Sequence, residues 1–223
     1  MRPEQRMLRD IEREVEYTRS LIGKKAFDAR VMAALKEVPR HEFVPEDLRG
    51  AAYENGPLPI GHGQTISQPY IVALMTDLLA PEPGDVILEV GTGSGYQAAV
   101  LSRLVRQVYT VEIIESLAAA ARERLQRLGY GNVEVRAADG YHGWPEHAPF
   151  DGIVVTAAAP AVPEPLVEQL KPGARLVIPV GLPYEHQELM VVEKTADGRI
   201  ETRAVLGVAF VPLTRRRAGR EGH

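Results

Sequence analysis

The sequence predicts an α/β fold, a seven-stranded and mostly parallel sheet with helices on both faces. The first observation is a short apolar run, Val86–Val90, which lies between Pro83-Gly84 and Gly91 and is typical of a buried parallel strand. The second is a loop with glycines at 91, 93 and 95, followed by a helical segment from about residue 96 to 104. Glycine lets a ligand approach the backbone, and the first turn of a helix offers free amides. This order therefore predicts a site for a nucleotide-like ligand.

The composition of the chain limits the classes of function that it can have. The chain has 223 residues, of which 45% are hydrophobic and 25% charged, so we expect one domain, residues 1–223. It has no cysteine, which excludes disulfides, thiolate catalysis and cysteine-bound metals. A formal charge of −4 argues against a nucleic-acid partner. No run approaches about 18 apolar residues, and the N-terminus is charged, so we expect a cytoplasmic protein with no membrane association.

Two helices and a long loop precede the first strand. Apolar residues recur at steps of three and four from Pro3–Ile22, which predicts an amphipathic helix. Asp28 is expected to cap a second helix that Pro39 ends. Residues 40–64 are rich in proline and glycine and show no period, so we expect a loop whose apolar residues pack against the rest of the molecule. A third helix is expected to begin at Ser67.

The remaining elements alternate as an α/β sheet requires. Further strands are expected at residues 107–111, 133–136, 153–156, 174–180, 187–194 and 199–211, and helices at 117–128 and 163–170. Asp197-Gly198 predicts a hairpin between the last two strands. The result is seven strands, the last of them antiparallel.

The spacing of the glycines narrows the choice of ligand. Dinucleotide-binding loops have G-x-G-x-x-G, whereas this chain has G-x-G-x-G. Glu89, just before the loop, would repel a phosphate and attract a cation such as a sulfonium or an ammonium group. The run E-V-G-T-G-S-G resembles the first motif of S-adenosylmethionine-dependent methyltransferases of the Rossmann-like class. The alternative is an ordinary glycine-rich turn.

Two acidic residues follow the next strands. Glu112 ends the second strand, where an α/β nucleotide site places a carboxylate on the ribose hydroxyls. Its alternative is a solvated cap for the next helix. Asp139-Gly140 follows the third strand, where related methyltransferases hold the adenine amino group, although Asp-Gly is also a common turn.

The segment before the third helix carries a more specific resemblance. Q-T-I-S-Q-P-Y, residues 64–70, resembles the protein-L-isoaspartate (D-aspartate) O-methyltransferase family. Three further stretches match it in order: Asp139-Gly140, residues 149–160 and Val211-Pro212-Leu213-Thr214. The resemblance runs from about residue 20 to 214. It implies the Rossmann-like methyltransferase fold with extra N-terminal helices, in which residues 1–64 cover the site, 65–214 form the cofactor-binding core and substrate strand, and 215–223 form a basic tail.

The resemblance also implies the reaction. A methyl group would pass from S-adenosyl-L-methionine, leaving S-adenosyl-L-homocysteine, to the α-carboxylate of L-isoaspartyl residues, with D-aspartyl residues as a further candidate. The partners would be isoaspartyl-containing peptides and unfolded or damaged proteins, and the chain would be a monomer. A carboxylate is ionised at neutral pH and needs no base, so the protein mainly has to align the reactants. No metal is expected.

The resemblance assigns residues to each side of the site. We expect Ser67 to donate its hydroxyl to the substrate carboxylate, although a serine here is also a natural helix N-cap. The other substrate-binding candidates are Thr65, Ile66, Ala158, Val211, Pro212, Leu213 and Thr214. The cofactor-binding candidates are Glu89, Gly91, Thr92, Gly93, Ser94, Gly95, Glu112, Asp139 and Gly140. Residues 211–213 could instead end a core strand, and His62 is expected to be a loop residue rather than an acid or base.

Three other functions compete with this one. A methyltransferase for a small molecule or RNA would use the same cofactor, but the chain lacks a basic stripe and an N/D-P-P-Y amine motif; residues 156–159 read T-A-A-A there. A catalytically silent adaptor would not need the intact loop and acidic residues. A nicotinamide dehydrogenase would need the absent glycine spacing.

Overall fold

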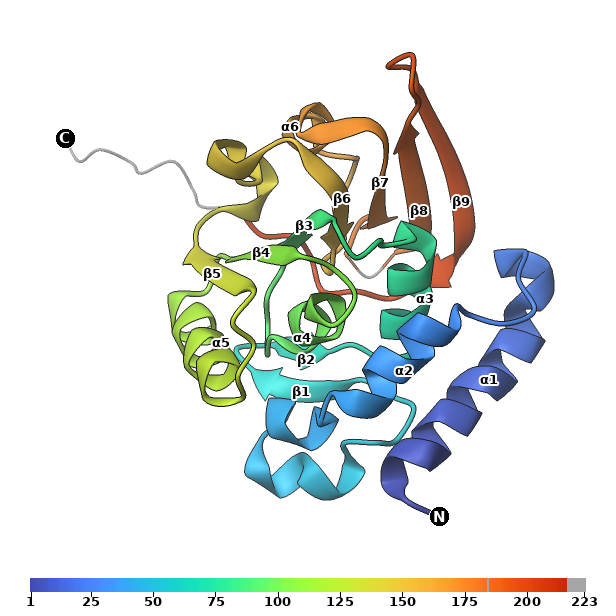
Figure 1. Cartoon of the computed structure of the whole chain (residues 1–223), viewed down its shortest axis with the longest axis vertical. Coiled ribbons are helices and arrows are strands. Elements are labelled where there is room, and N and C mark those ends of the chain that lie inside the picture. The colour runs from blue at the N-terminus through green and yellow to red at the C-terminus, as the bar shows by residue number, and fades with distance from the viewer. Residues whose placement is uncertain (184, 216–223) are drawn as a thin grey trace.

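The computed structural model describes residues 1–183 and 185–215, so the expected tail falls outside the described residues except for Arg215. Within these residues seven strands form one sheet, which confirms the predicted fold class (Figure 1). The strands are β3 (Val86–Val90), β4 (Gln107–Glu112), β5 (Val133–Ala137), β6 (Phe150–Val155), β7 (Leu170–Val180), β8 (Gln187–Lys194) and β9 (Ile200–Val208).

The strand order is β5-β4-β3-β6-β7-β8-β9. The chain moves outward from β3 to β5 and then returns to place β6 on the other side of β3, so the topological switch lies between β3 and β6. Ligands of open α/β sheets bind at this point, outside the carboxyl ends of the strands. The strand that runs against the others is β8, which pairs antiparallel with both neighbours, rather than the last strand as expected. The hairpin turn reverses the chain a second time, which returns β9 to the common direction.

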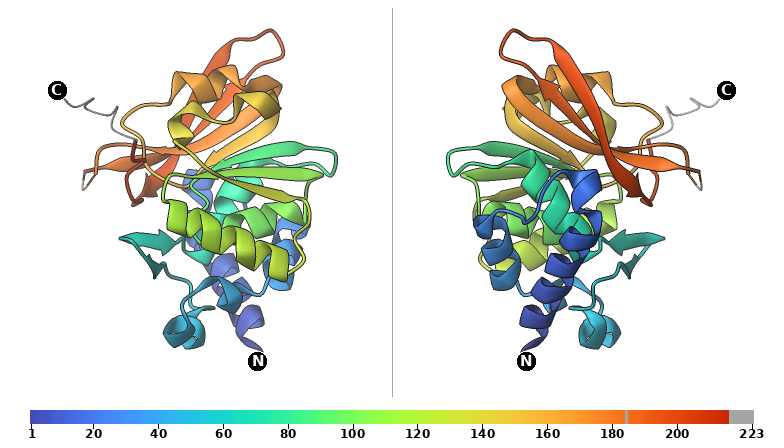
Figure 2. Two further views of the ribbon diagram at one scale, coloured as in Figure 1. Left: turned by 90° about the vertical axis from the view of Figure 1, so that its left-hand side faces the viewer. Right: turned by 90° about the vertical axis from the view of Figure 1, so that its right-hand side faces the viewer.

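Helices cover the two faces of the sheet unequally (Figures 1 and 2). One face packs against α1 to α5, with a core that includes Met7, Leu74 and Val100. The other packs against α6 and short 3-10 turns, with a core that includes Phe150 and Leu166. The helices are α1 (Pro3–Ile22), α2 (Ala29–Glu37), α3 (Pro69–Leu79), α4 (Tyr96–Ser102), α5 (Glu115–Arg127) and α6 (Glu164–Glu168). The last is shorter than expected because β7 already begins at Leu170.

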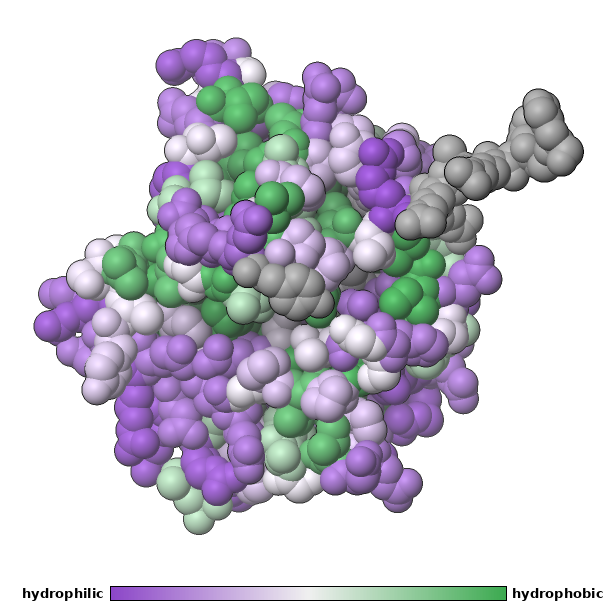
Figure 3. All heavy atoms as spheres, turned by 180° about the vertical axis from the view of Figure 1, so that it is seen from behind, coloured by the Kyte–Doolittle hydropathy of each residue, from purple (hydrophilic) through white to green (hydrophobic). Residues whose placement is uncertain are grey.

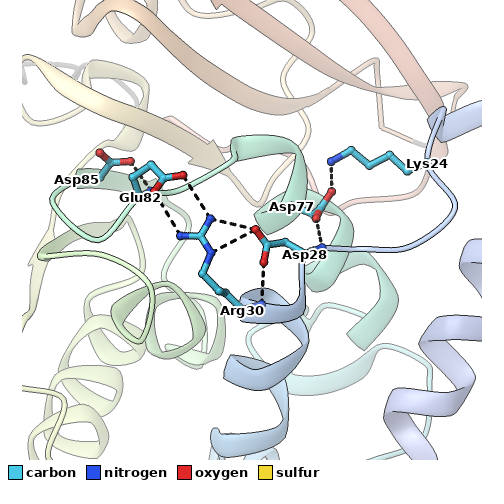
Figure 4. Close-up of polar contacts among 6 residues, drawn as sticks. All are labelled: Lys24, Asp28, Arg30, Asp77, Glu82 and Asp85. Atoms are coloured by element: carbon cyan, nitrogen blue, oxygen red, sulfur yellow. Dashed lines mark hydrogen bonds and ion pairs between the residues drawn. The ribbon is translucent and has the colours of Figure 1, made fainter.

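The N-terminal helices are fixed to α3 by a network of charged side chains around the buried Asp77 (Figure 4). The Asp77 carboxylate, at the C-terminal end of α3, pairs with Lys24 and accepts the backbone amide of Asp28 at 2.7 Å. Asp28 also caps α2, as predicted, by accepting the amide of Arg30 at 2.8 Å. The Arg30 guanidinium then bridges Asp28 and Glu82. These contacts hold α2 against the helix that begins beside the candidate site.

The segment expected to be a loop contains secondary structure. Two 3-10 helices, η1 (Arg40–Phe43) and η2 (Glu46–Ala51), precede a hairpin of β1 (Leu58–Gly61) and β2 (Gln64–Ile66). Strands of three and four residues are too short to show an alternating pattern, so the sequence did not reveal them. The expectation that apolar residues here pack inward is confirmed, since Phe43 and Val44 are buried.

This hairpin lies over the glycine loop. The Ile60 Cδ1 atom would be 3.3 Å from a Cβ added at Gly93. At the tip, His62 adopts a φ of 54°, and its Nε2 lies 3.1 Å from the Ser116 hydroxyl at the start of α5. The hairpin therefore covers the β3–α4 loop from the side of α5.

The surface carries hydrophobic patches separated by hydrophilic residues on the face shown in Figure 3. No helix within residues 1–183 and 185–215 has the length and apolar character that crossing a membrane would require.

Candidate active site

Three cavities meet at the carboxyl edge of the sheet. The large cavity, of about 430 Å³, lies between the start of α3, residues 206–211 at the end of β9 and just beyond it, and Glu14 of α1. The edge cavity, of about 50 Å³, lies between the ends of β3 and β4 and the segment 211–214. The loop cavity, of about 30 Å³, lies between the glycine loop and residues 65–67.

Shared walls make these cavities one site. Thr65 and Thr156 line all three. Ser67 lines the large and loop cavities, and Val211 lines the large and edge cavities. A ligand in either small cavity is therefore separated from the large cavity by single side chains.

The glycine loop is held by the neighbouring strand ends. Gly91 has a φ of +99°, and a Cβ there would lie 2.4 Å from the Thr156 hydroxyl oxygen. That hydroxyl donates to the Gly91 carbonyl at 2.6 Å, while the Gly91 amide donates to the Val111 carbonyl at 2.8 Å. Glycine is thus required both for the backbone conformation and for the close contact with Thr156, directly after β6.

Glu89 is a fully buried carboxylate with one free oxygen. Its Oε2 accepts the Thr110 hydroxyl at 2.6 Å, and Thr110 in turn lies 2.6 Å from the Thr92 hydroxyl. Within the described residues its Oε1 has no hydrogen-bond partner. Burial raises the pKa of Glu89 to about 8, with a smaller contribution from the charge of Glu112. A cation in the loop cavity, which Glu89 lines, would offset this cost.

Glu112 is fixed by two backbone amides. Its Oε2 accepts the Gly93 amide at 2.8 Å, and its Oε1 accepts the Ile114 amide at 3.0 Å. The side chain is buried and lines the edge cavity, so the alternative of a solvated helix cap is wrong. Each oxygen keeps a further lone pair for a hydroxyl donor.

Asp139 and Gly140 lie beside the edge cavity. Asp139 Oδ1 accepts the Tyr141 amide at 3.0 Å and caps the 3-10 turn η3 (Gly140–His142). Asp139-Gly140 therefore forms a turn, as the alternative interpretation of this dipeptide predicts. Its Oδ2 lies 3.9 Å from the Arg215 Nε. Gly140 lines the edge cavity, and a Cβ there would be 2.4 Å from the Val90 Cγ1. The absence of a side chain therefore lets η3 close against the end of β3.

Ser67 does not cap α3. The N-cap is Gln68, and the helix begins at Pro69, so the expected start and the capping alternative are both wrong. Within the described part of the chain the Ser67 hydroxyl makes no hydrogen bond. Its carbonyl accepts the Arg40 Nη2 at 2.8 Å. The hydroxyl remains available in the wall between the large and loop cavities.

The segment after β9 crosses the edge of the sheet. The Ala158 amide donates to the Val211 carbonyl, and the Leu213 amide donates to the Ala158 carbonyl, both at 2.8 Å. Since β9 ends at Val208, these residues do not end a core strand, and that alternative is wrong. Residues 211–214 line the edge cavity.

The structure brings most of the predicted residues together. The exceptions are Gly95, which packs against Leu125 of α5, and Asp139 and Ala158, none of which lines the three cavities. The predicted residues that line at least one of them are Thr65, Ile66, Ser67, Glu89, Gly91, Thr92, Gly93, Ser94, Glu112, Gly140, Val211, Pro212, Leu213 and Thr214.

Sequence reasoning missed three residues of the site. Thr156 is not among the candidates that the sequence indicates, although its place at the end of the expected strand 153–156 could mark it. Glu14 lines the large cavity and accepts the side-chain amides of Asn55 at 2.7 Å and Gln68 at 2.9 Å, which helical periodicity could not reveal. Arg40 reaches Ser67 from a 3-10 helix that had no sequence signal.

His62 lies in the hairpin turn and lines none of the three cavities, as expected of a loop residue. Among the residues with described positions, no group of three or more histidine, aspartate or glutamate side chains could hold a metal ion.

Comparisons with known proteins agree along most of the chain. The family model for protein-L-isoaspartate (D-aspartate) O-methyltransferase matches residues 14–218. A protein-L-isoaspartate O-methyltransferase 2 of Nitrosococcus oceani is 65% identical over 214 residues, covering 96% of this chain and 97% of its own. A protein-L-isoaspartate O-methyltransferase of Pelotomaculum thermopropionicum is 56% identical over 202 residues, covering 91% and 86%.

Two solved structures share the fold. A protein-L-isoaspartate O-methyltransferase superimposes with a TM-score of 0.80 at 29% identity, over 94% of this chain and 65% of the other. A Plasmodium falciparum protein assigned to the same class, in complex with S-adenosyl-L-homocysteine, superimposes with a TM-score of 0.74 at 26% identity, over 92% and 97%.

Proposed function

The chain belongs to the protein-L-isoaspartate (D-aspartate) O-methyltransferase family, and we propose how its site carries out methyl transfer. It transfers a methyl group from S-adenosyl-L-methionine to the α-carboxylate of L-isoaspartyl residues in damaged proteins. S-adenosyl-L-homocysteine is the other product. D-aspartyl residues are a second candidate substrate.

One observation carries this assignment of roles. A buried carboxylate with an unpaired oxygen, Glu89, and an unpaired hydroxyl, Ser67, line the same loop cavity. The first suits a cationic methyl donor and the second suits an anionic methyl acceptor. The two groups that must meet therefore have complementary partners in the wall of one narrow cavity.

The cofactor side fits S-adenosylmethionine. Glu89 would hold the ammonium group, and the glycine loop would let the donor approach the backbone. Glu112, already oriented by Gly93 and Ile114, would accept the ribose hydroxyls, and Gly140 leaves room for the base. When bound, the sulfonium supplies a strongly electrophilic methyl group. The other proposed cofactor-binding residues are Gly91, Thr92, Gly93, Ser94, Gly95 and Asp139.

The substrate side fits a peptide. The Ser67 hydroxyl would donate to the isoaspartyl carboxylate and set its direction of attack. Thr65 and Ile66 would offer backbone groups, while Ala158 holds the wall formed by residues 211–214 through two backbone hydrogen bonds. Because the acceptor is already ionised near neutral pH, no side chain has to remove a proton. The large cavity has room for the residues beside the isoaspartyl link.

We further propose that the chain is one domain in which residues 1–64 cover the site. We also propose that it acts as a monomer in the cytoplasm on unfolded or damaged proteins. The acidic net charge of −4 supports independence from nucleic acid.

Transfer of labelled methyl to two synthetic peptides tests the function. The peptides are identical except for one L-isoaspartyl or one L-aspartyl link. We expect a base-labile methyl ester on the isoaspartyl peptide alone. Cofactor binding without methylation of either peptide would contradict the proposed substrate, and methylation of both would contradict the proposed specificity.

A further inference from the structure

A buried arginine lies directly behind Ser67. Arg40, in η1, has no exposed surface. Its Nε donates to the Ala52 carbonyl at 2.7 Å, and its Nη2 donates to the Ser67 carbonyl at 2.8 Å and, at 3.4 Å, to that of Gly56. One guanidinium thus connects two separate stretches of backbone, residues 52–56 and Ser67.

Arg40 has no carboxylate partner within the described residues. Its Nη1 has no hydrogen-bond partner there either. Burying a cation without a counter-ion is unfavourable, and an apolar side chain of similar volume would fill the space at lower cost. Simple packing therefore does not account for an arginine at this position. The planar guanidinium of arginine explains it, because its N–H groups can bind several carbonyls in fixed directions.

The same guanidinium also contacts the cofactor side. Its Cζ lies 4.7 Å from the centroid of the Tyr96 ring. Tyr96 begins α4 immediately after the glycine loop and lines the loop cavity. Arg40 therefore contacts both Ser67, which is expected to hold the acceptor carboxylate, and Tyr96 in the wall of the loop cavity.

We propose that Arg40 is a positioning residue for methyl transfer, which fixes the backbone of Ser67 so that its hydroxyl points at the substrate carboxylate. This proposal rests on the proposed function. Ser67 belongs neither to β2, which ends at Ile66, nor to α3, which begins at Pro69, so regular secondary structure does not set its orientation. The Arg40 hydrogen bond to its carbonyl supplies that constraint. A shift of about 1 Å at such a group can reduce a rate about 100-fold.

A double-mutant cycle separates positioning from general stability. Arg40→Lys keeps the charge but replaces the planar guanidinium by a single ammonium, and Arg40→Gln removes the charge. Each is made in the wild-type and Ser67→Ala backgrounds. Arg122→Lys is the matched control, because Arg122 also donates to a backbone carbonyl, that of Val135 at 2.8 Å, away from the three cavities.

We expect Arg40→Lys to lower kcat on the isoaspartyl peptide about 10- to 100-fold, with the Kd for S-adenosylhomocysteine changed less than about twofold. In the Ser67→Ala background the same substitution should change kcat less than about twofold, because the group it positions is gone. Arg122→Lys should leave kcat unchanged. Thermal unfolding of every variant shows which are folded at the assay temperature.

Other results overturn the proposal. Losses that multiply in the double variant would show that Arg40 acts independently of Ser67. An unchanged kcat in Arg40→Lys or Arg40→Gln, or unfolding of both variants, would assign Arg40 to stability alone. If the wild type does not methylate the isoaspartyl peptide, the proposed function itself fails, which is a different result from a failed cycle.

Discussion

At the scale of single residues, the most informative group is the Glu89 carboxylate. The sequence already indicated a cation here, because an acidic residue before the loop would repel phosphate. It could not show that the side chain is fully buried with an unpaired Oε1, since burial depends on β4 and α4 packing around β3. Ser67 shows the same limit. Its spacing from Pro69 is typical of a helix cap, but Gln68 takes the N-cap position and the helix begins at Pro69, so the Ser67 hydroxyl caps nothing.

Glu89 makes cofactor binding dependent on pH. Because burial raises its pKa to about 8, the free protein carries a proton there at neutral pH. A bound ammonium favours the ionised form, so binding should release a proton, and the affinity for S-adenosylhomocysteine should rise with pH up to about 8. Calorimetry in two buffers of different ionisation enthalpy measures this release. Glu89→Gln is the control for titration of the ligand, and an equal release in that variant would contradict the prediction.

The same group should make folding stability fall with rising pH. The ordinary pKa of 4.5 applies to the unfolded chain, and about 8 to the folded one, so the folded state binds the extra proton between these values. This contribution is complete below about pH 4.5 and is lost as pH rises through about 8. Glu89→Gln, which resembles the protonated form, should therefore gain stability relative to the wild type from pH 5 to pH 8. Urea unfolding at both values measures it, and a constant difference would refute the assignment.

At the scale of elements, sequence patterns predict helices and long strands better than short strands. The amphipathic period located α1 from Pro3–Ile22, and the glycine and proline boundaries located β3. The β1–β2 hairpin had no comparable signal, because its two short strands pair only with each other and are positioned by packing on the glycine loop. The cover over the site was therefore predicted as a loop.

The link between α3 and α2 should depend on Asp77 (Figure 4). Its side chain is 2% exposed. The carboxylate pairs with Lys24 and accepts a hydrogen bond from the Asp28 amide. Asp77→Asn should lower the free energy of unfolding by about 3 kcal/mol, because it leaves a partly buried cation without its counter-ion. Glu82, which pairs with Arg30 but is 67% exposed, supplies the control. Glu82→Gln should cost less than about 1 kcal/mol. Similar losses in chemical denaturation would contradict this account.

At the scale of the whole molecule, the sheet order places the site. The carboxyl ends of β3, β4 and β6 meet at the switch point, so residues far apart in sequence line connected cavities. This much followed from the alternation of strands and helices. The reversed direction of β8 and the path of residues 211–214 did not, because they depend on how the last hairpin packs beside β7.

The large cavity also bears on substrate range. A repair enzyme acting on many proteins must recognise the backbone and the isoaspartyl link rather than one sequence. We therefore expect main-chain hydrogen bonds to dominate recognition. Alanine substitution of the side chains that flank isoaspartate in a test peptide should change kcat/KM by less than about fivefold, or about 1 kcal/mol. Large losses specific to one flanking side chain would contradict this prediction.

We expect the methyl donor and the acceptor carboxylate to meet beside Ser67. The most direct measurement is a crystal structure of the chain with S-adenosylhomocysteine and an isoaspartyl peptide. We expect the ammonium group at Glu89, the ribose at Glu112 and the isoaspartyl carboxylate within hydrogen-bond distance of the Ser67 hydroxyl, facing the cofactor sulfur. A carboxylate bound away from Ser67, or a sulfur that does not face it, would contradict this arrangement.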